Sequence, residues 1–211
     1  MKSPFHHAVD LAWRKHQGKT WGAHPYTEHI LRVLNVVHRA LDTSFVGPLL
    51  RFDEATPLRE ALDFDTFSER VGPYLSAAVL HDVPEDTDVT FDQIRALCGP
   101  VTAQIVEAVT TPASLGNRAK RAEALRLQLR ACPEAVPLKL ADVLVNADLC
   151  WETRHSLLFS YRKNWPALRS VSQDAILSLP PSMSPLLRPL TLEHGAKRLV
   201  RELDQQLHWR P

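Results

Sequence analysis

Four side chains capable of acid–base or metal chemistry lie within six positions of the stretch AAVLHDVPEDT, residues 77–87: His81, Asp82, Glu85 and Asp86. The apolar run before them predicts a buried helix. Because Pro84 disfavours a helical conformation for the residue before it, we expect that helix to end at about Asp82 or Val83. A helix C-terminus carries unpaired carbonyls and the negative pole of the helix dipole, so carboxylates there need a cation to offset them. The stretch therefore predicts either a solvated acidic turn or a metal site.

A divalent ion needs more ligands than one His-Asp pair, and two other side chains are candidates. His29 lies on a predicted helix, HPYTEHILRVLNVVHRA, and Asp142 lies in the otherwise apolar segment LKLADVLV. An unpaired carboxylate in such a segment would cost several kcal/mol. Its alternative role is an ion pair with Lys139, three residues earlier on the same helix.

This set of donors favours particular metals. Two imidazoles and two carboxylates suit Mn(II), Fe(II), Co(II) or Ni(II) better than Mg(II) or Ca(II), which prefer oxygen ligands alone. With positions left for water or substrate, such an ion could activate a hydrolytic water.

Helical periodicity dominates the elements that must position these residues, and it predicts an all-α protein. Pro25 suits the first turn of the second helix, where its missing N–H costs nothing. Thr90 and Gln93 form a capping-box pattern with Gly99 as the stop signal. The periodicity weakens after Trp151. Further helices are expected in YLSAAVLHD, NRAKRAEALRLQLRA, LKLADVLVNADLC and LEHGAKRLVRELDQQLHW.

Composition excludes several classes of function. The 211 residues carry a net charge of +1, so no global field attracts a nucleic acid polymer or an anionic membrane. The three cysteines are widely spaced, which argues against a disulfide framework or a zinc knot. We see no signal peptide and no transmembrane segment, and therefore expect a cytoplasmic protein. G-x-G-x-x-G, G-x-S-x-G and H-E-x-x-H are also absent from the sequence.

The order H…HD…D, formed by His29, His81-Asp82 and Asp142, resembles the HD superfamily of metal-dependent phosphohydrolases. The flanking segments HPYTEH, AAVLHDVPEDT, FDQI…CGPVTAQIVEAVT and LKLADVLVN are similar to the hydrolase domain of RelA/SpoT-type enzymes. They are most similar to the stand-alone small alarmone hydrolases. The resemblance covers roughly residues 5–165, with the order of the motifs preserved.

The resemblance implies a manganese-dependent enzyme that hydrolyses the 3′-pyrophosphate of (p)ppGpp to give GDP or GTP and pyrophosphate. It implies Mn²⁺, or another divalent transition metal, as the cofactor. The metal ligands would be His29, His81, Asp82 and Asp142. The carboxylates that orient or deprotonate the attacking water and assist the leaving group would be Glu85 and Asp86.

Substrate contacts are also implied by the resemblance. Lys19, ten residues before His29, matches a lysine of the family's nucleotide-binding loop. Asn146, one helical turn beyond Asp142, matches an asparagine near the ribose and phosphates. The full expected set of substrate-binding residues is Lys19, Arg118, Lys120, Asn146 and Tyr161.

Three departures from the family pattern leave the substrate open. Gly18 stands where an arginine that stacks on guanine is expected, with Arg14 or Lys15 one turn earlier as candidate substitutes. Asn117 stands in place of a lysine that faces the phosphates. Residues 41–72 are longer than the usual connection. The alternatives are an adenine alarmone, (p)ppApp, or another phosphorylated nucleotide such as NADPH, with an antitoxin-like role. A further alternative is a catalytically decayed nucleotide-binding regulator.

The expected architecture is an HD-domain helical bundle with the metal site between its core helices. We expect residues 1–177 to form this domain, with an excursion at 41–72. Residues 178–211 would supply a linker and a helix packed on the same domain. The expected partner is a small-molecule nucleotide, bound by a monomer or a homodimer.

Overall fold

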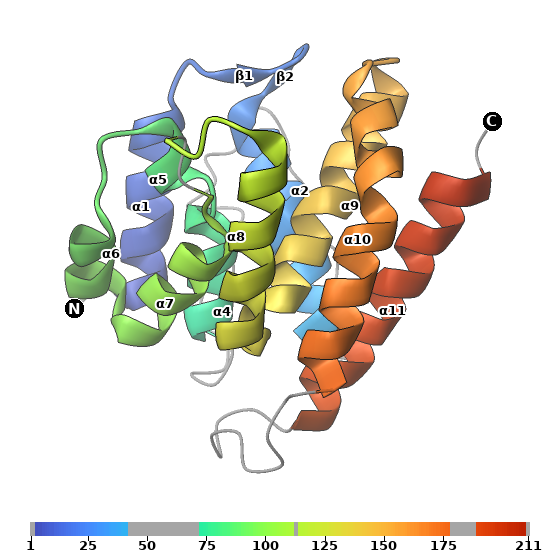
Figure 1. Ribbon diagram of the computed structural model, residues 1–211. Coiled ribbons are helices and arrows are strands. Elements are labelled where there is room, and N and C mark those ends of the chain that lie inside the picture. Colours follow the sequence, from blue (N-terminus) through green and yellow to red (C-terminus); the bar gives the residue numbers. More distant parts are fainter. Residues whose placement is uncertain (1–2, 42–71, 112–113, 178–188, 210–211) are drawn as a thin grey trace.

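The computed structural model describes residues 3–41, 72–111, 114–177 and 189–209. Helices make up nearly all of these ranges, which confirms the predicted all-α class (Figure 1). Most of the predicted excursion at 41–72 and of the linker after residue 177 lies outside the described residues.

The helices follow the expected order along the chain. Their bounds are α1 (Pro4–His16), α2 (Tyr26–Leu41), α4 (Gly72–Leu80), α5 (Val83–Asp86), α6 (Phe91–Cys98), α7 (Pro100–Val109), α8 (Arg118–Ala131), the 3₁₀ turn η2 (Pro133–Ala135), α9 (Val136–Glu152), α10 (Leu157–Leu177) and α11 (Pro189–Trp209). Between α1 and α2, the strands β1 (Thr20–Trp21) and β2 (His24–Pro25) form a small antiparallel hairpin, with Thr20 opposite Pro25.

Three helices form the centre of the bundle. Every residue of α4 from Tyr74 to Leu80 is buried, and α9 is buried along most of its length. The third helix, α2, packs against both. Around this centre, α1 and α7 cover α4, while α10 and α11 cover α9 (Figure 1). The apolar content of α4 and α9 therefore reflects burial on all sides rather than a single amphipathic face.

Local sequence signals set several helix ends. Thr90 and Gln93 make the predicted capping box at the start of α6. Gly99 ends that helix with a φ of 90°, a conformation that glycine adopts without strain. Asn117 caps α8, because its side chain accepts a hydrogen bond from the backbone N–H of Lys120.

Two prolines act differently from the prediction. The buried helix ends at Leu80, and Pro84 belongs to the first turn of the short helix α5 rather than to an irregular connection. Proline is tolerated there because the first turn of a helix has no internal partner for the missing N–H. Pro25 likewise lies in β2, one residue before α2 begins, rather than within the first turn of that helix.

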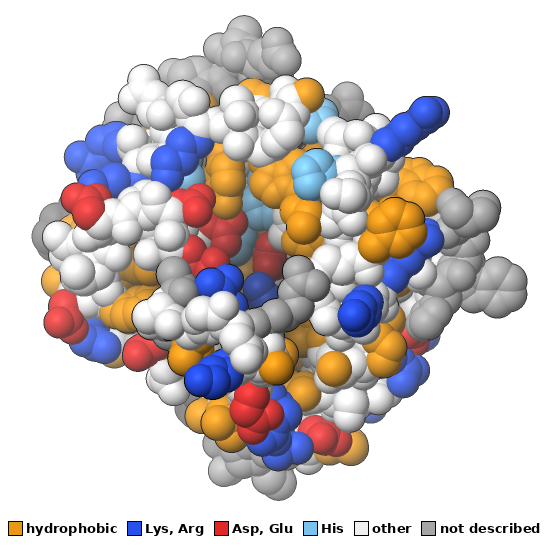
Figure 2. Space-filling model, turned by 45° about the horizontal axis from the view of Figure 1, so that its top comes forward, with side chains coloured by type: hydrophobic (Ala, Val, Ile, Leu, Met, Phe, Trp, Pro, Cys, Tyr) orange, Lys and Arg blue, Asp and Glu red, His pale blue; other side chains and the backbone are white. Residues whose placement is uncertain are grey.

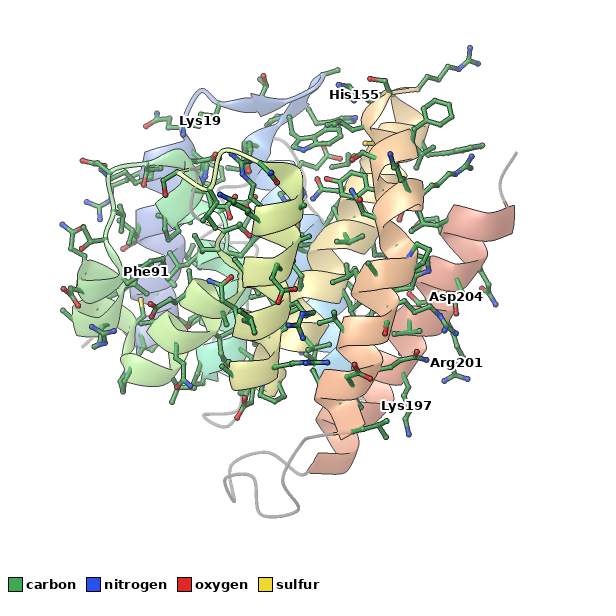
Figure 3. All side chains as sticks on the ribbon, viewed as in Figure 1. Lys19, Phe91, His155, Lys197, Arg201 and Asp204 are labelled. Atoms are coloured by element: carbon green, nitrogen blue, oxygen red, sulfur yellow. The ribbon has the colours of Figure 1, made fainter. Side chains whose placement is uncertain are left out.

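Helix α10 lies where the periodicity is weak. It runs for 21 residues and contains Pro166, which interrupts the regular hydrogen bonding of a helix. Its attachment to α11 is specific. Asp204, labelled in Figure 3, accepts hydrogen bonds from Trp165 Nε1 at 2.9 Å and from Arg169 Nε at 2.9 Å. The buried indole and this shared carboxylate thus hold α10 and α11 together.

Within the described ranges, no helix combines the length and the apolar character needed to cross a membrane.

The closest approach between α11 and the core lies at Gly195. This buried residue faces the backbone of Ala40 near the end of α2, and a Cβ atom added to it would overlap the Ala40 carbonyl group. Ordinary helix propensity favours alanine over glycine by about 1 kcal/mol, but it cannot relieve a clash with a main-chain atom.

We therefore expect Gly195→Ala to lower the free energy of unfolding by about 1–3 kcal/mol, as overpacking in a close-packed core does. Urea denaturation followed by circular dichroism measures this change. The matched control is Gly116→Ala, because nothing lies within 4 Å of a Cβ added there. Equal stability of the two variants would show that α11 does not pack tightly on α2.

Candidate metal centre

Three parts of the core bring the four predicted ligands together. His29 comes from the first turn of α2, and Asp142 comes from α9. His81 and Asp82 form the turn between α4 and α5. His29, His81 and Asp142 are buried, at 1%, 3% and 6% exposure.

Their polar atoms point at one another. The two Nε2 atoms of His29 and His81 lie 3.1 Å apart. Asp82 Oδ2 lies 3.3 Å from His29 Nε2 and 3.0 Å from His81 Nε2. Asp142 Oδ1 lies 3.7 Å from each of the same two nitrogens.

The separations among His29, His81 and Asp82 fit a metal site, and those of Asp142 are slightly longer. Donor atoms about 2.1 Å from a common transition-metal ion lie roughly 3.0–3.4 Å from one another, which follows from simple octahedral or tetrahedral geometry. Two facing imidazole nitrogens also cannot both be satisfied by direct contact when each presents a lone pair. His29, His81 and Asp82 therefore form a group that could hold a metal ion, with Asp142 beside it.

The ring orientation of His81 is fixed by a hydrogen bond on the side away from His29. Its Nδ1 lies 2.8 Å from the carbonyl oxygen of Ala78, to which it donates. That bond leaves the lone pair on Nε2 facing His29 and the carboxylates. Metal-binding histidines commonly use this arrangement, in which one ring nitrogen is anchored and the other is a ligand.

Asp142 forms the ion pair that its sequence context offers as an alternative, and it also faces the two predicted histidine ligands. Its Oδ2 accepts from Lys139 Nζ at 2.8 Å, which is the ion pair weighed as the alternative. Its Oδ1 accepts from Asn146 Nδ2 at 2.5 Å and faces the two histidines. Burial alone would lower the pKa of Lys139, but Asp142, together with Glu85 and Asp82, raises it, so this lysine stays charged.

The electrostatics of the group favour a positive charge at its centre. Burial alone would lower the pKa of His81, but the carboxylates of Asp82 and Asp142 outweigh it and raise that pKa to about 9. Burial would raise the pKa of Asp82, but the neighbouring imidazoles hold it well below its usual range. A proton satisfies this demand in part, and a divalent cation would satisfy it with more charge.

Tyr26 is a member of the site that motif spacing alone did not assign. Its hydroxyl donates to Asp82 Oδ2 at 2.5 Å, and its ring packs edge-on against His29 at 5.6 Å. Burial, with the nearby Asp82 carboxylate, raises the pKa of the Tyr26 phenol, so it remains a donor. The available signal was its position three residues before His29, which places both side chains on one face of α2.

The predicted catalytic carboxylates both lie in α5, next to the group. Glu85 Oε1 accepts from the backbone N–H of Thr111 at 2.8 Å, and burial raises the pKa of Glu85. Asp86 Oδ2 lies 3.5 Å from His16 Nε2. The short helix thus places Glu85 against α7 and Asp86 against α1.

The predicted substrate residues are only partly brought together. Lys19 donates to the backbone carbonyl of Asp86 at 2.6 Å, and it lies at the same end of the bundle as His155 (Figure 3). Tyr161 is half-buried, and its phenol pKa is raised by burial and then by the Asp142 carboxylate, which places it near the site. Lys120 lies on the exposed side of the first turn of α8, and the side chain of Arg118 lies outside the described part of the chain.

The site opens on the face of the molecule turned forward in Figure 2. Acidic and histidine side chains gather there in the floor of a hollow, with hydrophobic and basic side chains around its mouth. The acidic floor suits a cation, and the basic and hydrophobic side chains at the mouth suit a ligand with an anionic part and an apolar part.

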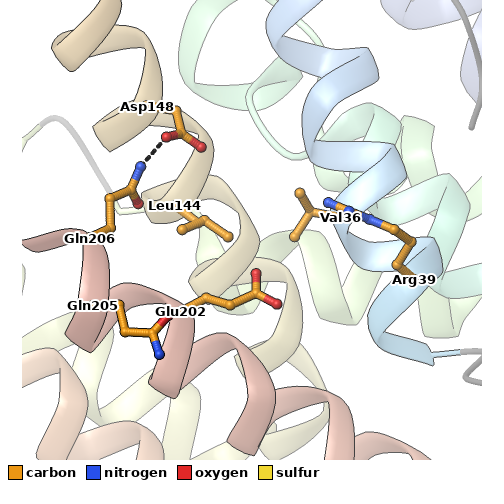
Figure 4. Close-up of a pocket in the computed structure, with 7 residues that line it drawn as sticks. All are labelled: Val36, Arg39, Leu144, Asp148, Glu202, Gln205 and Gln206. Carbon is orange, nitrogen blue, oxygen red and sulfur yellow. Dashed lines mark hydrogen bonds between the residues drawn. The ribbon is translucent and has the colours of Figure 1, made fainter.

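A second, separate pocket of about 380 Å³ lies between α2, α9 and α11 (Figure 4). Asp148 and Leu144 line it from α9. At 100° per residue they point to the side of that helix opposite Asp142 and Asn146. The polar residues of α9 therefore serve two different environments.

The fold and the site are those of an all-α helical bundle with a His/Asp group, able to hold a metal ion, between its core helices. The chain resembles the small alarmone hydrolases of the HD superfamily, which confirms the resemblance drawn from its motifs. No family model matches the chain.

The sequence is similar to those of several curated proteins. The chain is 41% identical over 76 residues to the guanosine-3′,5′-bis(diphosphate) 3′-pyrophosphohydrolase MESH1 of Danio rerio, and 40% identical to that of Homo sapiens. It is 37% identical over 81 residues to the enzyme of the same activity from Aquifex aeolicus. These matches cover 34–37% of this chain, 40% of each MESH1 and 12% of the Aquifex aeolicus protein. The chain therefore matches less than half the length of these relatives.

A solved structure extends the similarity in fold over nearly the whole chain. It is described as a metazoan ortholog of SpoT that hydrolyses ppGpp and plays a role in starvation responses. The TM-score is 0.51 at 22% identity, with 94% of this chain and 96% of that chain covered. At this identity the match supports the fold.

Removal and return of metal test the centre directly. After treatment with a chelator and dialysis, we expect Mn(II) or Co(II) to rebind stoichiometrically and to raise the thermal midpoint. Ligand at about 100 times its Kd stabilises a folded protein by about 2.7 kcal/mol. Asp142→Asn should lose both effects, whereas Asp148→Asn, on the opposite face of α9, should keep them. Metal analysis and differential scanning fluorimetry provide the readouts, and equal metal content in both variants would contradict this assignment.

The hydrogen bond from Tyr26 to Asp82 gives a finer prediction. Tyr26→Phe keeps the ring but removes the donor, so we expect metal affinity to fall by about 10–100-fold, as for other groups that orient ligands. Isothermal titration with Mn(II) measures the change. Tyr74→Phe is the matched control on α4, and a loss of affinity in both variants would point to a general packing effect.

Proposed function

We propose that the chain is a divalent-metal-dependent phosphohydrolase that removes the 3′-pyrophosphate of guanosine tetra- and pentaphosphate, with Mn²⁺ as its metal. The observation that carries the proposal is the group of His29, His81 and Asp82, which could hold a metal ion, with Asp142 3.7 Å from both histidines and Glu85 and Asp86 in the adjacent helix α5. The names of the curated relatives support the choice of substrate.

The metal, when bound, would act as a Lewis acid on the phosphate and on the attacking water. His29, His81, Asp82 and Asp142 would hold it. Lys139 and Asn146 keep Asp142 directed at the histidines, and Tyr26 does the same for Asp82. The site therefore needs little rearrangement to work.

Glu85 is the better placed of the two carboxylates to act as a general base. Its bond from the Thr111 N–H fixes one oxygen and leaves the other available. Its raised pKa brings it closer to the pH at which a carboxylate both accepts and releases protons effectively. In the proposed step Glu85 takes a proton from the attacking water as the water oxygen bonds to phosphorus. The bond between that phosphorus and the 3′-oxygen then breaks, and Glu85 returns the proton to the departing 3′-oxygen while Asp86 assists by orienting this transfer.

The identity of the nucleotide base is a separate question. Gly18 and Asn117 differ from the residues expected to contact the substrate, so they do not determine which base is bound. Gly18 has a φ of 76° and offers no side chain to stack on a base. Asn117 uses its side chain to cap α8. An adenine alarmone or NADPH is therefore the competing substrate. A decayed regulator is disfavoured because its buried carboxylates would lack the cation that offsets them. A cytoplasmic location and a monomeric or homodimeric state stay predictions.

Turnover of defined nucleotides tests the proposal. Purified protein with Mn(II) is given ppGpp, pppGpp, ppApp and NADPH separately, and released pyrophosphate and orthophosphate are measured. We expect pyrophosphate from ppGpp and pppGpp. Glu85→Gln should lower kcat by about 10²–10⁴-fold, the usual contribution of a general base.

Glu107→Gln, an exposed carboxylate on α7, is the matched control and should leave the rate unchanged. Strong preference for ppApp would move the assignment to an adenine alarmone. If the protein binds nucleotide tightly but hydrolyses none of the four compounds, the proposed enzymatic function is wrong and a regulatory role is supported instead.

A further inference from the structure

His16 is a buried titratable side chain that the proposed reaction does not yet use. It is the last residue of α1 and is 1% exposed. Its sequence context places it on the apolar face of that helix, with Phe5, Val9 and Ala12. A polar ring on such a face needs a partner for each of its nitrogens.

The two ring nitrogens of His16 face two different acceptors. Nδ1 lies 3.0 Å from the carbonyl oxygen of Ala12. Nε2 lies 3.5 Å from Asp86 Oδ2, and it has no hydrogen-bond partner among the described residues. A neutral imidazole carries a single hydrogen, so it can satisfy only one of these acceptors.

Of the two acceptors, the Asp86 carboxylate is expected to form the stronger hydrogen bond with the imidazole N–H. The Ala12 carbonyl is four residues before His16 and is already the regular helical acceptor for its backbone N–H. Asp86 offers a carboxylate oxygen, and hydrogen bonds to ionised acceptors are roughly twice as strong as those to neutral ones. The gap of 3.5 Å is longer than a formed bond, but catalytic hydrogen bonds are often long before substrate is bound.

The ring cannot easily turn away from Asp86. It stacks on Tyr26 with centroids 4.6 Å apart and an angle of 5° between the planes. Tyr26 is itself held by its bond to Asp82. The imidazole ring of His16 is therefore held in place, and its Nε2 can fix the position of the Asp86 carboxylate.

We propose that His16 is a positioning residue that donates from Nε2 to Asp86 and so directs this carboxylate at the reacting phosphate. The inference rests on the proposed function, since Asp86 is the group assigned to assist the leaving oxygen. It adds a residue from α1, an element that supplies none of the predicted metal ligands.

The charges around the ring are consistent with a neutral imidazole. Burial lowers the pKa of His16, and the Asp86 carboxylate opposes that shift. Lys19, which follows α1, lowers the pKa further, whereas Asp82, from the turn after α4, raises it. Because the net shift is downward, the ring has one hydrogen at neutral pH, and the choice of nitrogen decides whether Asp86 is held.

Kinetics separate positioning from packing. His16→Phe keeps a ring to stack on Tyr26 but removes the donor, so we expect kcat to fall by about 10–100-fold with KM within about 3-fold, as for other small misplacements of reacting groups. His16→Gln restores an N–H donor and should recover kcat to within about 5-fold of wild type. His7→Phe, the same substitution on the same helix, is the control and should leave kcat unchanged. Equal losses in His16→Phe and His16→Gln would make the role of His16 structural and overturn the proposal.

A double-mutant cycle tests whether His16 acts through Asp86. If it does, His16→Phe combined with Asp86→Ala should be no slower than Asp86→Ala alone. Multiplied losses would show that the two residues act independently, against the proposal.

The hydrogen bond between His16 and Asp86 can also be tested without measuring hydrolysis, so this test does not depend on the proposed function. Nitrogen-15 NMR of the histidine rings reports which nitrogen of His16 carries the hydrogen. We expect the hydrogen on Nε2 in the wild type and its transfer to Nδ1, facing Ala12, in Asp86→Ala. A hydrogen on Nδ1 in both proteins would overturn the proposal. If the wild type hydrolyses no nucleotide, the proposed function fails, while the position of this hydrogen still decides whether His16 and Asp86 form a pair.

Discussion

The structure depends on one electrostatic constraint: two buried imidazoles, the buried carboxylate of Asp142 and the partly exposed carboxylate of Asp82 have their polar atoms directed at one another. Asp82 Oδ2 lies 3.0 Å from His81 Nε2, and Asp142 Oδ1 lies 3.7 Å from the same atom. Buried groups of like charge are tolerated only when an opposite charge lies between them. A cation held at this point would therefore stabilise the core by offsetting these carboxylates, beyond what the proton on His81 and the ion pair with Lys139 supply.

The surrounding side chains reduce the freedom of each member of the group. The Ala78 carbonyl fixes the ring of His81, and the Tyr26 hydroxyl fixes the carboxylate of Asp82. These partners come from α4 and α2, so the helices that build the core also aim the polar atoms. Such supporting contacts allow a site to bind its ion without first being ordered by it.

Much of this arrangement follows from the sequence. The helical class and the capping box at Thr90 are readable from local patterns, and motif order predicts the proximity of His29, His81 and Asp82, with Asp142 beside them. The short helix that contains Pro84 was not predicted. A proline is compatible both with the end of one helix and with the first turn of the next, and the sequence alone does not distinguish the two.

Contacts between segments distant in sequence were equally hard to predict. The importance of His16 and Tyr26 arises from contacts to Asp86 and Asp82, which are 70 and 56 residues away. Helix α10 is held by Trp165 and Asp204 across two helices, and its own sequence shows only weak periodicity. Periodicity reports which face of a helix is buried, but it does not report which partner that face meets.

The ion pair between Lys139 and Asp142 has a consequence for coordination. Lys139 occupies Oδ2, so Oδ1, which also accepts from Asn146, is the oxygen that Asp142 would offer to a metal in the proposed function. Substituting Lys139 would free the second oxygen and allow bidentate binding, which would take up space otherwise open to water or phosphate. The lysine would thus limit how many oxygens the protein offers to an ion, and it would leave room around that ion for the reactants.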